Sequence, residues 1–150
     1  MSELRELYQE VILDHNKNPR NRRAQDSATH KADGYNPLCG DKVTVFLRVE
    51  QGVVRDASFV GSGCAISTAS ASLMTESLRG KSVEEVRALF GRVRSLLTEE
   101  VEPDIEALGK LAVFSGVREF PMRVKCASLA WHTLIAAVEG KEGHGSASTE

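Results

Sequence analysis

The sequence predicts an α+β domain in which a small antiparallel β-sheet, of about three strands, packs against several α-helices. Residues 42–50 alternate between apolar and polar side chains, as a half-buried strand does, and a similar segment returns after a short turn. Residues 2–16 and several later segments carry apolar residues at helical spacing. Because the expected strands are grouped and helices follow them, we expect the helices to cover the sheet.

The first expected element is a helix over residues 2–16, in which Leu4, Leu7 and Val11 lie on one face. The segment "NKNPRNRR" ends this helix, because Pro19 and the asparagines around it favour a turn. A polar stretch and a short strand are then expected before the turn "NPLCGD". This turn places a cysteine and an aspartate two residues apart.

A β-hairpin is the clearest element of the sequence. The segment "KVTVFLRVE" places Val43, Val45, Leu47 and Val49 on one face, and "VVRDASFVG" is the expected partner strand. The dipeptide "QG" between them fits a two-residue turn. We therefore expect an antiparallel pair here.

Helices are expected after the hairpin. One begins near Cys64, and its many Ala and Ser residues allow a close approach to a neighbour. A second helical segment covers residues 81–100 and opens with a capping box formed by Ser82 and Glu85. A third helical piece follows Pro103, which marks a break.

The C-terminal part is expected to contain an extended connector, "VREFPMRVK", and a last helix that starts near Cys126 and ends by Gly140. Residues 141–150 are small and polar, which predicts a disordered tail. No linker composition divides the rest of the chain. Residues 1–140 are therefore expected to form one domain.

Composition restricts the classes of function. The chain has 150 residues, 41% of them hydrophobic and 27% charged, with a formal net charge of -2. This balance predicts a folded protein without the broad basic surface typical of nucleic-acid binding. No apolar run approaches the roughly 20 residues of a membrane span. The N-terminal residues are charged and do not resemble a signal peptide, so we expect a cytoplasmic protein.

Three cysteines, Cys39, Cys64 and Cys126, are the main candidates for chemistry. An odd number of cysteines in a chain without an export signal argues against a disulfide framework. Each is expected at a turn or at the start of a helix, where unpaired N–H groups and the helix dipole favour a thiolate. Burial as small apolar side chains is the alternative, because free cysteine is often buried.

Asp41 adds a carboxylate next to the first of these cysteines. Three thiolates and one carboxylate form a ligand set that suits tetrahedral Zn²⁺, and the same set could hold iron and sulfide. Gly40, Gly61 and Gly63 would let the backbone approach such a centre closely. The sequence contains no Cys-x-x-Cys pair, so spacing alone leaves both the metal site and the buried-cysteine alternative open.

Two histidines are expected to have structural roles. His15 closes the first helix, where a cation suits the negative end of the helix dipole. His132 lies six residues after Cys126 on a different face of the last helix, so we interpret it as a surface or core residue.

Four motifs together resemble the U-type iron–sulfur cluster assembly proteins, a family that includes IscU, SufU and the N-terminal domain of NifU. They are "DHNKNPRN" at 14–21, "NPLCGD" at 36–41, "GSGCAISTASASLM" at 61–74 and "FPMRVKCASLAWHTL" at 120–134. The motifs occur in the order of the family and span nearly the whole expected domain. The resemblance implies an IscU/SufU-like fold. It also implies that Cys39, Asp41, Cys64 and Cys126 bind zinc or a nascent cluster and accept sulfur from a cysteine desulfurase.

Two features make the chain most similar to the SufU branch. Lys125 stands where the IscU branch has a histidine, and "FPMRVK" is a poor match to that branch's Leu-Pro-Pro-Val-Lys signal for a chaperone. Residues 82–100 also look like the insertion of the SufU branch. The SufU resemblance implies a zinc-dependent sulfurtransferase that works with a SufS-like desulfurase, whereas the IscU resemblance implies a non-enzymatic scaffold for a [2Fe–2S] cluster passed to acceptor proteins.

The sulfur-acceptor hypothesis gives the site residues different roles. Cys39 is the expected sulfur acceptor, because its turn can move more easily than the start of a helix. Arg123 and Lys125 would steer the anionic persulfide or contact the partner; the alternative for both is a solvated charge. A purely structural zinc protein is the third hypothesis, and it predicts no sulfur transfer.

Overall fold

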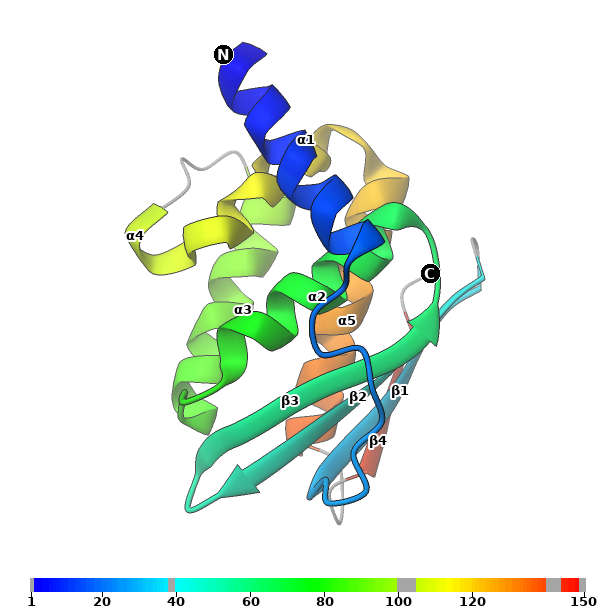
Figure 1. The fold of residues 1–150 in the computed structure, drawn as a ribbon, viewed down its shortest axis with the longest axis vertical. Helices are drawn as coiled ribbons and strands as arrows, with labels where there is room; N and C mark the ends of the chain where they lie inside the picture. Colours follow the sequence, from blue (N-terminus) through cyan, green and yellow to red (C-terminus); the bar gives the residue numbers. More distant parts are fainter. Residues whose placement is uncertain (1, 38–39, 100–104, 140–143, 149–150) are drawn as a thin grey trace.

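The computed structural model describes residues 2–37, 40–99, 105–139 and 144–148. Its sheet has the strand order β3-β2-β1-β4, and helices lie on one side of it (Figure 1). β1 (His30–Asn36), β2 (Asp41–Glu50) and β3 (Val53–Ser62) pair antiparallel. The predicted α+β class with a three-stranded antiparallel sheet is therefore confirmed.

A fourth strand extends the sheet where the sequence predicts a disordered tail. β4 (His144–Ser148) pairs parallel with β1, with Lys31 opposite His144 and Tyr35 opposite Ser148. This pairing supplies partners for backbone groups on the outer edge of β1, which would otherwise remain open. The small residues of β4 carry no periodicity that would have predicted a strand.

The hairpin between β2 and β3 forms as predicted. Gln51 and Gly52 both have positive φ, 53° and 74°, which is the backbone geometry of a two-residue turn of type I′. Val45 and Leu47 are fully buried on the side of the sheet that the helices cover, opposite Phe59 and Ala57 of β3. Burying such a side chain contributes about 1.5–3 kcal/mol, so this face forms much of the core.

The helices are α1 (Ser2–Lys17), α2 (Ala65–Leu78), α3 (Val83–Thr98), α4 (Ile105–Leu108) and α5 (Pro121–Glu139), with a 3₁₀ segment, η1 (Gly109–Glu119), before α5. α2 and α5 pack against the strands, while α1 and α3 lie farther from the sheet (Figure 1). The capping box of α3 is confirmed: Ser82 and Glu85 exchange hydrogen bonds of 3.0 and 3.1 Å. No helix in the described part of the chain is long and apolar enough to cross a membrane.

The start of α5 corrects the sequence analysis. The expected extended connector is instead the end of η1 followed by the first turn of α5, which begins at Pro121. Proline is well suited to the first position of a helix because its N–H would be unpaired there anyway. The helix was expected to start near Cys126, five residues after its observed first residue.

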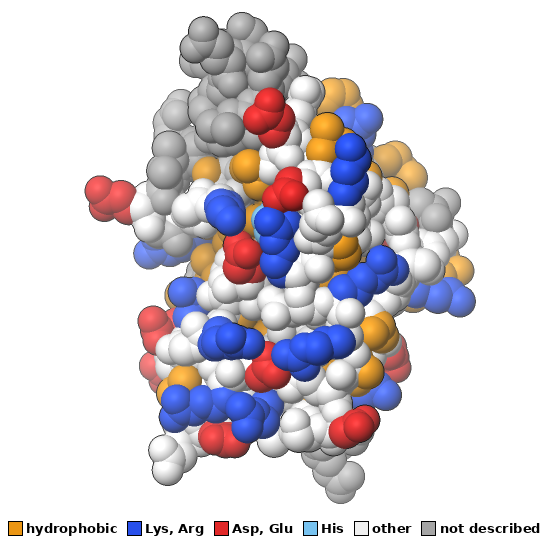
Figure 2. Space-filling model, in the orientation of Figure 1, with side chains coloured by type: hydrophobic (Ala, Val, Ile, Leu, Met, Phe, Trp, Pro, Cys, Tyr) orange, Lys and Arg blue, Asp and Glu red, His pale blue; other side chains and the backbone are white. Residues whose placement is uncertain are grey.

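Basic and acidic side chains are mixed on the face shown in Figure 2, including the part formed by β3 and the end of α2. Asp56 of β3 accepts hydrogen bonds from Arg23 at 2.6 Å and from Arg79 at 3.0 Å. Burial raises the pKa of Asp56, but these two guanidinium groups outweigh it and hold the pKa below its usual value. Part of the positive charge of this face is therefore neutralised within the chain.

Candidate metal centre

Three of the four predicted ligands meet at one end of the sheet. A carboxylate oxygen of Asp41 and the Sγ atoms of Cys64 and Cys126 all lie within 4.8 Å of one another. They come from the first residue of β2, the residue before α2 and the second turn of α5. Cys39, the fourth predicted ligand, lies outside the described residues.

Asp41 is held by its position in the sheet and by the chain around Cys64. It is 2% exposed and pairs with Asn36, the last residue of β1, across the turn that contains Cys39 in the sequence. Its Oδ1 accepts the backbone N–H of Cys64 at 3.0 Å. This bond occupies one carboxylate oxygen and leaves Oδ2 facing the thiol of Cys64 at 3.8 Å.

Gly63 makes this approach possible. A Cβ atom at this position would lie 2.8 Å from Oδ1 of Asp41 and 3.1 Å from Oγ of Ser67. The first distance is shorter than nonbonded carbon and oxygen atoms accept, so a side chain here would displace the carboxylate. The predicted role of a glycine in close approach is confirmed for this residue.

Cys64 occupies the N-cap of α2, as the sequence analysis predicted. Its backbone is extended, with φ -70° and ψ 171°, and its Sγ accepts the N–H of Ser67 at 3.4 Å. The thiol takes the place that a serine or aspartate oxygen usually has at this position. Cys64 is exposed, so among the three predicted ligands that the structure describes it is the one open to solvent and to a partner. We did not predict the hydrogen bond from Ser67, although the side chain of an N-cap residue usually accepts such a backbone N–H.

Cys126 differs from the prediction in its place on the helix. It is 7% exposed and lies five residues after the first residue of α5, so the end of the helix dipole does not act on it as proposed. Its thiol reaches the centre because α5 packs against both α2 and the sheet. The sequence left a buried cysteine and a metal ligand as alternatives, and Cys126 is both buried and part of the cluster.

The donor set fits a tetrahedral soft metal. Zinc–sulfur bonds of about 2.3 Å and zinc–oxygen bonds of about 2.0–2.2 Å place a sulfur and an oxygen ligand of a tetrahedral site roughly 3.6 Å apart. The 3.8 Å between Sγ of Cys64 and Oδ2 of Asp41 is close to this spacing. Two thiols and a carboxylate are also ligands that iron accepts, so the geometry of the described residues suits both metals.

The two predicted steering residues lie on the first turns of α5. The guanidinium carbon of Arg123 lies 4.8 Å from the ring centroid of Phe120, and both residues are exposed. Lys125 is half-buried and directly precedes Cys126. Their positions are next to the centre in sequence, and their role in steering stays a prediction.

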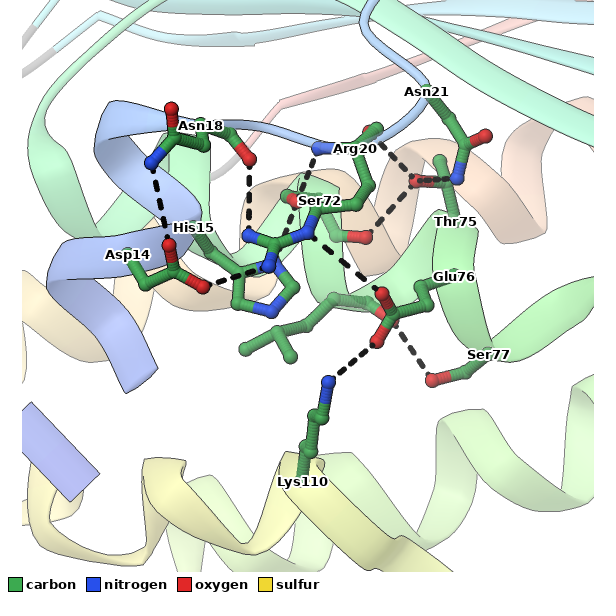
Figure 3. Close-up of polar contacts among 11 residues, drawn as sticks. Asp14, His15, Asn18, Arg20, Asn21, Ser72, Thr75, Glu76, Ser77 and Lys110 are labelled. Carbon is green, nitrogen blue, oxygen red and sulfur yellow. Dashed lines mark hydrogen bonds and ion pairs between the residues drawn. The ribbon is translucent and has the colours of Figure 1, made fainter. Parts of the chain in front are cut away.

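The turn of the first motif, at residues 18–21, and the end of α1 contact α2 through polar side chains (Figure 3). His15 is 1% exposed, and its Nδ1 lies 2.7 Å from Oγ of Ser72, which also accepts the backbone N–H of Arg20 at 2.8 Å. Asn21 donates to Oγ1 of Thr75 at 3.3 Å. We call these contacts of His15, Arg20 and Asn21 with Ser72 and Thr75 the α2 latch.

The latch corrects the expectation for His15. Burial, followed by the charge of Arg20, lowers the pKa of His15, so the ring is neutral near pH 7 and is no cation at the helix end. The hydroxyl of Ser72 accepts the N–H of Arg20, and it can also donate its own proton to Nδ1 of His15 in the tautomer that leaves this nitrogen unprotonated. His15 therefore has the structural role that was expected, but as a neutral ring and not as a cation.

Comparison with known proteins identifies the class of protein that this fold and centre define. A model of the NifU-like N-terminal domain matches residues 7–139. Such a match covers most of the chain, and the protein belongs to this family. The resemblance stated from the four motifs is therefore confirmed.

Individual relatives include both branches of the family. The chain is 38% identical over 137 residues to the zinc-dependent sulfurtransferase SufU of Bacillus subtilis, covering 91% of this chain and 92% of the relative. It is 42% identical over 133 residues to the iron–sulfur cluster assembly scaffold protein IscU of Thermotoga maritima, covering 89% and 93%.

Solved structures agree with this assignment. The crystal structure of a SufU scaffold protein from Fervidobacterium islandicum superposes with a TM-score of 0.79 at 34% identity, covering 84% of this chain and 92% of that one. The N-terminal part of a NifU-like protein from Brucella abortus gives a TM-score of 0.78 at 26% identity, covering 85% and 88%.

Proposed function

We propose that this protein serves iron–sulfur cluster assembly as a zinc-dependent sulfur acceptor for a cysteine desulfurase. The observation that carries the proposal is the cluster of Asp41, Cys64 and Cys126 within 4.8 Å. The similarity to a relative named as a zinc-dependent sulfurtransferase supports the choice of zinc and of sulfur transfer. Free thiols persist in reducing compartments, which supports a cytoplasmic place for the reaction.

In this proposal Cys39, Asp41, Cys64 and Cys126 hold one Zn²⁺. A bound zinc ion keeps its thiol ligands deprotonated and ties separate segments of the chain together. The hydrogen bond from the N–H of Cys64 to Asp41 orients the carboxylate, and the N–H of Ser67 orients the thiol of Cys64. Asp41 is the only oxygen ligand of the set and the easiest of the four to exchange at a soft metal.

The transfer step uses Cys39 as the nucleophile. Docking of the desulfurase would free Cys39 from the metal, while Cys64 and Cys126 would stay as zinc ligands. The freed thiolate of Cys39 attacks the terminal sulfur of the persulfide on the desulfurase. The sulfur–sulfur bond of that persulfide breaks, the desulfurase cysteine leaves as a thiolate, and a new persulfide forms on Cys39. Arg123 and Lys125 steer the anionic persulfide toward the site or contact the desulfurase. The persulfide sulfur then passes to downstream assembly or acceptor proteins.

A scaffold for a [2Fe–2S] cluster is the second candidate. The similarity to IscU scaffold proteins of Thermotoga maritima and Streptococcus pyogenes, at 42% and 36% identity, favours it. The same four residues would hold the cluster as cargo. An oxygen ligand such as Asp41 would keep that cluster labile and ready for transfer.

Metal analysis combined with a sulfur-transfer assay separates these functions. The purified protein should contain one zinc per chain and should stimulate turnover of a SufS-like desulfurase. Cys39→Ser should abolish the stimulation, because an alcohol does not take up persulfide sulfur. Stimulation by Cys39→Ser at the wild-type level would show that Cys39 is not the acceptor.

Asp41→Ala, with Asp33→Ala as its control, tests the exchangeable ligand. Asp33 is an exposed aspartate of β1 whose carboxylate accepts a hydrogen bond from Thr44, so its loss removes the same charge outside the centre. Under the relay function only Asp41→Ala should lower zinc affinity and change the stimulated rate. Under the scaffold function the protein reconstituted with iron and sulfide should be coloured, and Asp41→Ala should retain that colour longer. A colourless protein after reconstitution would reject the scaffold.

A further inference from the structure

The first turn of α2 contains a buried hydroxyl group that the fold does not use. Ser67 is 6% exposed, and its backbone N–H donates to Sγ of Cys64, but its Oγ makes no hydrogen bond with a described residue. The other buried hydroxyl groups in the described part of the chain all have a hydrogen bond: those of Ser58, Ser70, Ser72, Thr75 and Thr133. Leaving a buried hydroxyl without a partner destabilises a protein, so Ser67 needs a further explanation.

The side chain of Ser67 is directed at the metal centre. Its Oγ lies 3.1 Å from the point where a Cβ atom on Gly63 would stand, and Oδ1 of Asp41 lies 2.8 Å from the same point. The two oxygen atoms therefore border one small space, which the absence of a side chain on Gly63 leaves open. A rotation of either side chain into this space would bring the hydroxyl and the carboxylate together.

The position of Ser67 on the helix shows why its hydroxyl is unused. Ser67 is the third residue after the N-cap Cys64, where a capping box places a Glu or Gln that accepts the N-cap N–H. α3 has this arrangement with Ser82 and Glu85. In α2, the N–H of Cys64 is accepted instead by Oδ1 of Asp41, from β2, at 3.0 Å. Asp41 therefore caps the helix as well as lining the centre, and the hydroxyl of Ser67 remains as an additional donor beside it.

Building on the zinc site of the proposed function, we propose that Ser67 is a positioning residue of the metal centre. Its hydroxyl donates a hydrogen bond to Oδ1 of Asp41 in the zinc-loaded protein. A carboxylate has about four lone-pair sites, so Oδ1 can accept this bond in addition to the N–H of Cys64. Two donors on Oδ1 fix the orientation of the carboxylate and leave Oδ2 as the ligand atom. Loss of such a partner of a metal ligand commonly weakens metal binding about 10–100-fold.

Ser67→Ala tests this role in two states of the protein. Without metal, the variant loses no hydrogen bond of the Ser67 hydroxyl, and alanine favours a helix more than serine does, so its melting temperature should equal or exceed that of the wild type. With zinc, we expect about tenfold weaker binding, measured in competition with a chelator. Ser72→Ala is the control, because Ser72 is hydrogen-bonded in the α2 latch: it should lower the melting temperature and leave the zinc affinity unchanged.

A double-mutant cycle then identifies the group through which Ser67 acts. If its hydroxyl orients Asp41, Ser67→Ala should change the zinc affinity less than about twofold once Asp41→Ala is present. The inference is overturned by zinc binding in Ser67→Ala at the wild-type level, by a melting temperature of metal-free Ser67→Ala that falls as it does in Ser72→Ala, or by an equal loss of affinity with and without Asp41→Ala. Each of these results leaves the proposed function intact, whereas a wild-type protein that binds no zinc would overturn both.

Discussion

Helix α2 contacts the rest of the protein at two polar sites, the candidate metal centre and the α2 latch, and the two sites differ in chemistry. At its N-terminus, the thiol of Cys64 lies close to the carboxylate of Asp41 in β2 and the thiol of Cys126 in α5. Two turns further on, the α2 latch joins Ser72 to His15 and Arg20, and each donor there meets an acceptor. The latch consists of hydrogen bonds within the chain, whereas the centre brings together two thiols and a carboxylate that suit a metal cation as ligands.

This difference separates a structural contact from a functional one. A satisfied polar network in the interior stabilises one conformation and needs nothing else. A cluster of thiols and a carboxylate has the opposite character, because its members repel when they are ionised. The two regions should therefore respond differently to metal removal, to loss of a hydroxyl and to acid.

Metal removal should have the largest effect. A zinc ion present at about 1,000 times its dissociation constant adds roughly 4 kcal/mol of stability, which corresponds to about 10 °C in melting temperature for a chain of this size. We expect complete chelation to lower the melting temperature by about this amount and Zn²⁺ to restore it, measured by calorimetry. An unchanged curve in metal-free protein would mean that the centre has no structural role.

Ser72→Ala should break the latch and leave the centre loaded. It removes the partner of the Arg20 N–H and of Nδ1 of His15, at a cost of about 2–3 kcal/mol, or roughly 8 °C. Zinc content should stay at one per chain. The control is Ser77→Ala, because Ser77 only donates to the carbonyl of Leu73 on its own helix, and its loss should cost less than about 0.5 kcal/mol. Equal losses of stability in the two variants would show that the hydrogen bonds of Ser72 in the α2 latch contribute no more than the bond of Ser77.

Gly63→Ala should act on the centre alone. The added methyl group meets Oδ1 of Asp41 at 2.8 Å, so the carboxylate must move, and we expect about tenfold weaker zinc binding in competition with a chelator. Gly91→Ala is the control: its Cβ meets nothing within 4 Å, and it replaces a glycine within α3, so it should raise stability by up to about 1 kcal/mol. Unchanged zinc affinity in Gly63→Ala would show that the carboxylate tolerates the displacement.

Acid should produce the smallest effect, through the latch. The pKa of His15 is lowered in the folded protein, so the unfolded chain binds its proton more readily. Stability should therefore be complete above the unfolded value of about 6.5 and should decrease as the pH falls toward the folded value. Between pH 7 and 5 the melting temperature of the wild type should fall about 2 °C further than that of His15→Gln. Parallel curves for the two proteins would exclude His15 as the cause.

The sequence by itself determined the elements whose signals are local. Alternation predicted β2, and β-branched and aromatic residues after a two-residue turn predicted β3. Helical spacing predicted α1, and the pair Ser82 and Glu85 predicted the start of α3. These signals depend on the period of the backbone and on hydrogen bonds between near neighbours, so they can be seen without a fold. The motifs around Cys39, Cys64 and Cys126 also identified the family, because a specific combination of residues in order carries that information.

Only the tertiary structure decided what depends on residues far apart in the chain. The meeting of Asp41, Cys64 and Cys126, the burial of His15 against Ser72 and the pairing of β4 with β1 all join segments that no local pattern relates. The charge of His15 was misjudged for the same reason: the helix dipole acts locally, but burial by a distant helix removed the solvent that a cation needs. The packing of α5 against α2 and the sheet places the buried Cys126 next to Asp41 and Cys64.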